Sequence, residues 1–413
     1  MNGRLIGVGR GVVAAAVAVL GCLTLALHAR ARAVDGHGAG RLRPTDQGRR
    51  AALAGALQRA LMDTLAAEPH FPGMLLRVEA PRLPLAWEGA AGLADRATGR
   101  PLAPGDEVRV ASVTKTFTAA TVLRLVEQGR LALDAPIARY LPAAYTTLLA
   151  GGGYRPDRIT VRQLLRHTGG LADYADTDAF DDAVRAAPAH RWTRLEQVRF
   201  ALAHGRPVAP PGAVYHYADT GYILLGEIIE RVGGLPLAAA YRSLLRFGPL
   251  GLTHTYLETL EAAPPGRPPR AHQYYRGLDL ERVDASFDLY GGGGLVSTMA
   301  DLGHFYRALL RGRVFARPGT LRAMLAIPAT NVDDADDAEP GDGYGMGIYR
   351  LTAAGVACWG HAGAWGTFAF HCPALDLTVA ASDNQGDVDI DERAFLAHIV
   401  QLVRAGGSGR ALP

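Results

Sequence analysis

The pairing of Ser112 with the only lysine of the chain is the feature that most constrains this sequence. The chain of 413 residues has 43 basic residues, and 42 of them are arginine. The exception stands in Ser112-Val113-Thr114-Lys115. At the N-terminus of a helix, residues three apart lie on the same face, so the lysine amine can reach the serine hydroxyl. The apolar pattern predicts that helix over 113–128, with Gly129 ending it.

The chemistry of this pair follows from the residue types. Arginine keeps its proton in proteins, whereas a buried lysine can lose it and then take a proton from a serine hydroxyl. The free N–H groups of a helix N-terminus can stabilise the oxyanion that forms. With six serines and one lysine in the chain, this spacing is rarely met by chance. The alternative is a serine that caps the helix and a solvated lysine.

Predicted strands lie at both ends of the chain. We expect strands over 74–80 and 85–92, then over 344–351, 356–361, 367–372 and 377–381. Helices are expected from Asp46 to before Pro69 and over 389–405, and the middle of the chain is mostly helical. The predicted fold is α+β: one antiparallel sheet from both ends of the chain, flanked by helices, with a helical insertion. The expected domain covers 46–408, with an α/β part of 46–118 and 288–408 and a helical part of 119–287.

Two further segments carry groups that suit the same chemistry. Tyr217-Ala218-Asp219 precedes a predicted helix, and a tyrosine there can share a proton with the lysine. His361-Ala362-Gly363 ends a predicted strand, where small residues leave room for a substrate backbone and the histidine adds a donor. Taken singly, each segment favours a structural role: a packed tyrosine with Asp219 as helix cap, and a structural histidine.

Together and in this order, the three segments resemble the penicillin-recognising serine hydrolases, which include class C β-lactamases, serine DD-peptidases, D-aminopeptidases and related esterases. The resemblance extends to three more runs typical of that family: Leu164-Leu165-Arg166-His167-Thr168-Gly169-Gly170-Leu171, Tyr222-Ile223-Leu224-Leu225-Gly226 and Gly293-Gly294-Leu295-Val296-Ser297-Thr298.

The resemblance implies a role for each site residue. Ser112 is the nucleophile, Lys115 its base and Tyr217 the second proton carrier. His361 takes the place of the base in the third motif, and the N–H groups of Ser112 and Ala364 form the oxyanion hole. Asp219, His361, Gly363 and Ala364 would contact substrate. No cofactor and no metal are implied, and the partner is a small-molecule or peptide substrate.

Two departures from the family pattern bear on the substrate. Asp219 stands where the family usually has asparagine, and an ionised aspartate cannot donate a hydrogen bond to a substrate carbonyl. His361 stands where β-lactamases often have lysine, which is closer to the DD-peptidase and D-aminopeptidase branches. A strong β-lactamase is therefore not expected. The sequence favours a DD-carboxypeptidase- or esterase-like hydrolase. It leaves open a weak β-lactamase, a D-aminopeptidase and a catalytically inactive sensor or binding module.

The N-terminus has the pattern of an export signal. Arg4 and Arg10 precede an apolar run over 11–27, and Ala31-Arg32-Ala33 fits a cleavage site. We expect a signal peptide over 1–33, a linker over 34–45, and a periplasmic or secreted protein. An uncleaved signal would be the only membrane contact. The net charge of +3 is small, and no nucleic-acid-binding pattern is present.

Two of the three cysteines flank the predicted turn around Trp365. Cys358 and Cys372 are each seven residues from it, so a hairpin centred there places them opposite each other on one side of the sheet. An exported chain permits their oxidation. We therefore predict a disulfide; the alternative is two buried free thiols.

Overall fold

A nine-stranded antiparallel sheet forms the centre of the protein. The computed structural model describes residues 32–33, 44–332, 338–388 and 390–408. The strands are ordered β1-β3-β2-β14-β13-β12-β11-β10, and β4 pairs with β3. Their bounds are β1 Arg32–Ala33, β2 Gly73–Ala80, β3 Leu85–Asp95, β4 Arg100–Pro101, β10 Gly343–Tyr344, β11 Tyr349–Ala353, β12 Val356–Gly363, β13 Thr367–Cys372 and β14 Leu377–Ser382.

The two ends of the chain meet inside this sheet. Strand β14 pairs antiparallel with β2, so that Val379 lies opposite Val78. The prediction of one sheet assembled from both ends of the chain is confirmed, and with it the α+β fold class.

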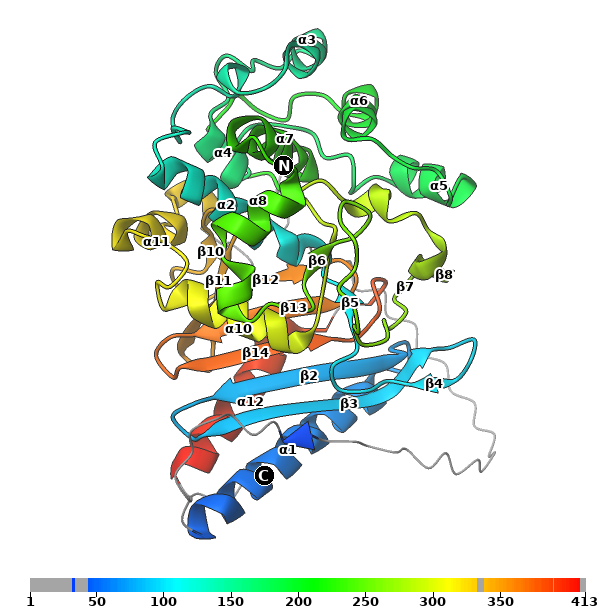
Figure 1. Ribbon diagram of the computed structural model, residues 1–413, viewed down its shortest axis with the longest axis vertical. Helices are drawn as coiled ribbons and strands as arrows, with labels where there is room; N and C mark the ends of the chain where they lie inside the picture. Colours follow the sequence, from blue (N-terminus) through cyan, green and yellow to red (C-terminus); the bar gives the residue numbers. More distant parts are fainter. Residues whose placement is uncertain (1–31, 34–43, 333–337, 389, 409–413) are drawn as a thin grey trace.

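Helices cover both faces of the sheet (Figure 1). Helices α1 (Pro44–Ala67) and α12 (Glu392–Ser408) pack on each other and on one face. Helix α10 (Met299–Leu310) packs on β2, β13 and β14 from the opposite face. Along β2 the side chains alternate between the two layers, because successive residues of a strand point to opposite faces. Met74, Leu76 and Val78 join the hydrophobic cluster under α1 and α12, whereas Leu75 joins the cluster on the other side.

The helical part of the chain surrounds helix α2 (Thr114–Glu127). Helices α7 (Asp219–Gly233) and α8 (Leu237–Leu244) pack directly on α2. A small sheet of β5 (Val108–Arg109), β9 (Leu295–Ser297) and β6 (Tyr256–Leu257) leads into its N-terminus. The remaining elements are α3 Ala143–Gly151, α4 Val161–Leu165, α5 Asp178–Ala186, α6 Arg194–His204, α9 Phe247–Leu250, α11 Pro318–Leu325, β7 Tyr274–Tyr275 and β8 Leu278–Asp279.

The structure corrects three predicted boundaries. The expected strand over 344–351 is two strands, β10 and β11, because the chain turns at Gly347, whose φ is +70°. Helix α1 begins at Pro44, two residues before the expected start, so the predicted linker over 34–45 overlaps it. The segment 119–287 also contains strands β6, β7 and β8. Most of the predicted signal peptide and linker lies outside the described residues.

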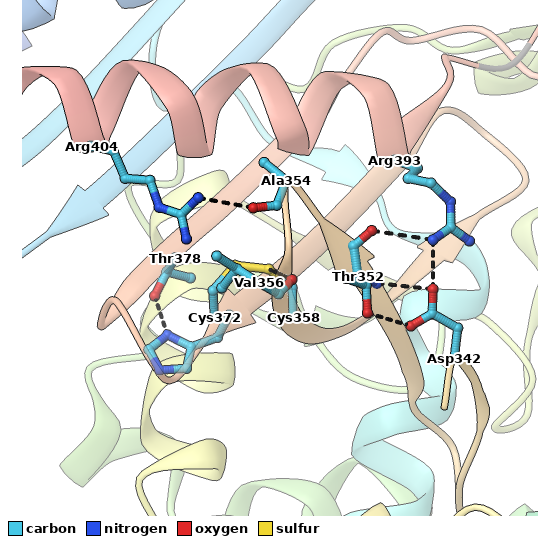
Figure 2. Close-up of a disulfide and its surroundings, with 10 residues drawn as sticks. Asp342, Thr352, Ala354, Val356, Cys358, Cys372, Thr378, Arg393 and Arg404 are labelled. Atoms are coloured by element: carbon cyan, nitrogen blue, oxygen red, sulfur yellow. Dashed lines mark hydrogen bonds and ion pairs between the residues drawn. A yellow bond between two sulfur atoms is a disulfide. The ribbon is translucent and has the colours of Figure 1, made fainter. Parts of the chain in front are cut away.

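A disulfide joins Cys358 of β12 to Cys372 of β13, as predicted. The two Cα atoms are 4.0 Å apart, at directly opposed positions of the ladder. Figure 2 shows the bridge beneath α12, whose Arg404 donates to the carbonyl of Ala354 and whose Arg393 bonds Asp342. The bridge therefore joins β12 to β13, while the two arginines of α12 hold the turn before β12 and the residue before β10.

Across the residues that the structure describes, none of the helices combines the length and apolar character that crossing a membrane requires.

Candidate active site

A sharp turn between β5 and α2 presents Ser112. Ala111 has a positive φ of +44°, an unusual conformation for a residue with a side chain, and it begins a short 3-10 helix over Ala111–Val113. The amide of Val110 is held by the carbonyl of Leu295 in β9. Ser112 is half-buried, so its hydroxyl stands at the start of α2 and keeps contact with solvent.

Lys115 lies one turn further along the buried face of α2. Its side chain is fully buried. Its Nζ atom lies 2.7 Å from Ser112 Oγ, 2.5 Å from Asp219 Oδ1 and 3.0 Å from the carbonyl oxygen of Gly292. An ammonium group has three N–H donors, and each finds an acceptor here. The contact that the spacing predicts between serine and lysine is present.

Tyr217 covers the same amine from the other side. Its ring centroid is 4.9 Å from Lys115 Nζ, which is within the range of a cation–π contact. Burial raises the pKa of the Tyr217 hydroxyl well above its usual range, and the charge of Asp219 raises it further. A hydrogen bond with Ser112 acts in the opposite direction. Tyr217 is therefore a neutral phenol at rest, hydrogen-bonded to the serine that it is predicted to serve.

Asp219 is the first residue of α7, and its carboxylate benefits from the partial positive charge of that helix N-terminus. Its backbone N–H donates to Asp173 Oδ1 at 3.0 Å. Burial raises the pKa of Asp173 to about 8, and the negative charge of Asp219 adds to this. Asp173 is therefore mostly protonated at neutral pH, beside a carboxylate that is bound to the lysine.

A third carboxyl group, Asp288, completes this acidic surrounding. Its Oδ2 atom accepts a hydrogen bond from the indole N–H of Trp365 at 2.7 Å. Burial and the charge of Asp219 raise the pKa of Asp288 to about 6. We call Asp173, Asp219 and Asp288 the acidic cluster. The charge of Lys115 lowers the pKa of both Asp173 and Asp288, and the charge of Arg109 also lowers the pKa of Asp288.

The four-glycine run 291–294 encloses the lysine and the acidic cluster. A Cβ atom on Gly292 would lie 2.5 Å from Asp219 Oδ1, and one on Gly293 would lie 1.8 Å from Asp288 Oδ1. No side chain fits at either position unless the carboxyl groups move. The unusual composition of this run therefore has a local cause: the backbone itself forms the wall against which the carboxyl groups rest.

His361 lies near this group, and both of its ring nitrogens have partners. Nδ1 donates to the carbonyl of Ala362 at 2.6 Å, and Nε2 accepts from the hydroxyl of Tyr344 at 3.1 Å. Burial, together with the charge of Lys115, lowers the pKa of His361 to about 3. The histidine is therefore neutral at physiological pH. Its ring lies 6.4 Å from the ring of Tyr217, centroid to centroid.

Gly363, at the end of β12, lies against the turn that presents the serine. A Cβ atom there would be 2.4 Å from the carbonyl oxygen of Val110 and 3.2 Å from the amide nitrogen of Ser112. A glycine at this position therefore allows the two backbone segments to approach closely. This role is additional to the space for substrate that the sequence suggests. Ala364 follows and is exposed. Its predicted place in the oxyanion hole stays a prediction.

Comparison with known proteins agrees with this geometry. A family model described as Beta-lactamase matches residues 58–401. The chain belongs to the beta-lactamase family. Members similar to this chain are serine hydrolases with several activities, and the chain is a hydrolase of this kind. The resemblance to penicillin-recognising serine hydrolases is confirmed.

Family members similar to this chain carry different names. Esterase EstB of Burkholderia gladioli is 37% identical over 171 residues, which cover 40% of this chain and 41% of that esterase. Penicillin-binding protein 4 of Amycolatopsis lactamdurans is 31% identical over 320 residues, covering 74% of this chain and 77% of that protein. The alignment with the first of these relatives thus spans less than half of its length.

Among solved family structures, a D-stereospecific amidohydrolase from Streptomyces sp. superposes with a TM-score of 0.69 at 30% identity, covering 88% of this chain and 99% of that chain. The D-amino acid amidase from Ochrobactrum anthropi SV3, complexed with L-phenylalanine amide, gives a TM-score of 0.67 at 26% identity, covering 86% and 99%.

The structure brings together Ser112, Lys115, Tyr217 and Asp219 as the sequence suggests, with His361 and Gly363 at the border of the site. Sequence reasoning missed Asp173, Asp288 and the carbonyl of Gly292. Asp173 lies two residues after the family-typical run that ends at Leu171, and this proximity is the one sequence signal that could have pointed to it. Nothing in the spacing of Asp288 relates it to the serine.

Proposed function

We propose that this protein hydrolyses short esters and amides whose molecules carry no carboxylate group. The reaction proceeds through an acyl-enzyme on Ser112. The acidic cluster around Lys115 is the observation that carries this proposal. Three carboxyl groups lie around the buried amine of Lys115, and Asp219 already binds this amine at 2.5 Å. The charge of Lys115 is therefore already neutralised by Asp219, and a substrate carboxylate gains little attraction from it.

The neutral state of His361 supports the same substrate class. β-Lactams and peptides ending in D-alanine carry a carboxylate, and a cationic group near the third motif would bind it well. With a pKa lowered to about 3, His361 carries no charge at neutral pH. The site therefore offers a carboxylate little attraction, whereas neutral esters and amides, including amides with a free amino group, meet no such barrier. DD-carboxypeptidase and β-lactamase activities become the less favoured alternatives.

In the proposed reaction, Ser112 Oγ attacks the substrate carbonyl and Lys115 takes its proton. Tyr217, a neutral phenol in contact with the serine, can pass a proton to the leaving group. The N–H groups of Ser112 and Ala364 would stabilise the oxyanion. Water then releases the acyl group. The relatives named as an esterase, a D-stereospecific amidohydrolase and a D-amino acid amidase support a reaction of this type.

We also propose that the protein is exported, on the basis of its N-terminal signal pattern. The disulfide between Cys358 and Cys372 supports this location, because such bonds persist in oxidising compartments.

A substrate panel tests the proposed function. The panel contains a p-nitrophenyl ester of a short acid, a D-amino acid amide, a peptide ending in D-Ala-D-Ala and nitrocefin. We expect kcat/KM to be highest for the ester or the amide. A preference for nitrocefin or the peptide would contradict the proposal.

Intact-protein mass spectrometry after treatment with a fluorophosphonate tests the acyl site, because the adduct must disappear in Ser112→Ala. An absence of any adduct on the wild-type chain would favour the inactive binding module.

A further inference from the structure

Lys115 can act as a base only after it has lost a proton. When charged, its three N–H groups point to Ser112 Oγ, Asp219 Oδ1 and the carbonyl of Gly292, and its nitrogen has no free lone pair. When neutral, the same three contacts fit with the direction of one reversed, so that the serine hydroxyl donates to the amine. The geometry therefore suits both protonation states without any movement of heavy atoms.

Asp219 is the one partner of Lys115 that can receive this proton. A backbone carbonyl and a serine hydroxyl are far too weakly basic, whereas a carboxylate is a common proton acceptor. Its Oδ1 atom is 2.5 Å from Nζ, a short hydrogen bond. Gly292 closes the site behind this oxygen, because a Cβ atom there would approach it to 2.5 Å. The proton therefore has a short direct path to Asp219.

We propose that Asp219 holds the proton of Lys115 during acylation, so that the pair forms its own neutral base without losing a proton to solvent. One N–H bond of Lys115 breaks as an O–H bond forms on Asp219, and rotation about the Cε–Nζ bond then turns the lone pair of the amine from Asp219 to the serine hydroxyl. The serine O–H bond then breaks as Oγ bonds the carbonyl carbon, and the proton joins Lys115 while the carbonyl π electrons move to oxygen. The carbonyl bond then re-forms as the bond from carbon to the leaving group breaks, and Lys115 gives the leaving group a proton, directly or through Tyr217. Asp219 finally returns the stored proton to Lys115.

This inference deepens the proposed function and rests on acylation of Ser112. It also gives a reason for the aspartate at a position where the family usually has asparagine, because an amide side chain cannot accept this proton. Asp219 acts through Lys115, so we regard it as a positioning and proton-holding residue. It is distinct from the groups that touch the reacting carbonyl.

Other ionisable groups lie around Asp219, and the test must distinguish their effects on the rate from the effect of Asp219. They are Lys115 on α2, Asp173 and Tyr174 before α5, Tyr217 before α7, Tyr222 on α7, and Asp288 before the glycine run; His167 and His361 face Lys115. Burial keeps the tyrosines and histidines neutral around pH 7. Asp173 and Asp288 have pKa values raised partly by the charge of Asp219, so its removal would move their titrations to lower pH.

The test measures the rate of Ser112 labelling by a small fluorophosphonate as a function of pH, which avoids any assumption about the natural substrate. For the wild type we expect a rate that is nearly constant around neutrality, because the pair holds the same number of protons before and after the internal transfer. Asp219→Asn must lose the lysine proton to solvent. Its labelling should be slower by about 10²-fold at pH 7 and should rise about tenfold per pH unit through the neutral range.

The direction of the pH shift separates the possible outcomes. If Asp219 only keeps Lys115 charged and in place, the wild-type rate rises with pH and the Asp219→Asn profile moves to lower pH. A rate reduced equally at every pH would show a structural role, and either result overturns the proposal.

Asp219→Glu keeps a carboxylate and should retain the flat profile at a lower rate, which provides a second test if the asparagine variant does not fold. Asp134→Asn makes the same chemical change at an exposed ion pair with Arg162 and serves as the matched control.

Wild-type labelling at Ser112 is itself the test of the acyl site, and the substrate panel is the test of the substrate class. A failure of the proposed function is therefore distinguishable from a failure of the proton-holding role.

Discussion

The amine of Lys115 lies 2.7 Å from the hydroxyl oxygen of Ser112, and the lysine side chain is fully buried. Ser112 precedes Lys115 by one helical turn. Because the amine must be able to exist without its proton, substitution by arginine should be nearly as harmful as truncation. We expect Lys115→Arg to lower kcat/KM for a p-nitrophenyl ester by about 10²–10⁴-fold. Lys115→Met preserves the length of the side chain without the amine and serves as the control. Near-normal turnover by the arginine variant would show that positive charge alone is required.

Asp173 should make the stability of the protein depend on pH. Its pKa is about 8 in the folded protein and about 3.9 in an unfolded chain, so the folded state binds more protons between these values. Stability from this group is therefore full below about pH 4 and decreases as the pH rises toward 8.

Asp173→Asn keeps the oxygen that accepts from the Asp219 amide but cannot ionise. The free energy of unfolding of this variant relative to wild type, from urea titration, should rise between about pH 5 and pH 8. We expect a change on the order of 2 kcal/mol, after discounting for partial solvent contact. A constant difference across this range would mean that Asp173 ionises normally in the folded protein.

Gly292 should tolerate no side chain, because a Cβ atom there would meet Asp219 Oδ1 at 2.5 Å. Gly292→Ala is expected to move the carboxylate and lower kcat by about 10²-fold, the usual cost of an ångström-scale displacement in an active site. Gly233→Ala is the matched control, since nothing lies within 4 Å of the added carbon. Equal activity of the two variants, both folded by circular dichroism, would be incompatible with this tight fit.

The disulfide between Cys358 and Cys372 should stabilise the protein measurably. It closes a loop with a sequence separation of 14, which corresponds to about 3 kcal/mol in the chain-entropy model. The double variant Cys358→Ala/Cys372→Ala should lose stability of that order in a denaturant titration. Thiol titration of the denatured, unreduced wild-type chain should find only Cys22, if the N-terminal segment is retained, and three thiols after reduction. Equal numbers of thiols before and after reduction would refute the bridge.

Local patterns in the sequence predicted the elements that carry the site. The helix over 113–128 is observed as Thr114–Glu127, the strand over 367–372 is observed with those bounds, and the opposed cysteines followed from counting residues around Trp365. These features depend on neighbours in the chain, so periodicity and spacing are sufficient to find them.

The acidic cluster depends on contacts between distant segments, and the sequence did not reveal it. Asp173, Asp219 and Asp288 come from three different loops and helix ends, and only the packing of α2 against α7 and the glycine run brings them together. The same limit applies to His361. Its position suggested a donor near the serine, but its partners are Ala362 and Tyr344, which only the folded sheet places there.

The pairing of β2 with β14 has a consequence for how the molecule assembles. Val78 can pair only after Val379 has been synthesised, so the sheet cannot be completed until nearly the whole chain has been made. Contacts between residues so far apart in sequence slow folding, because a long loop must close before they form. The turn that presents Ser112 rests on Gly363 of β12, a strand from the same late segment. Ser112 is synthesised early, but the turn that presents it is completed only after the C-terminal strands have been synthesised and have joined the sheet.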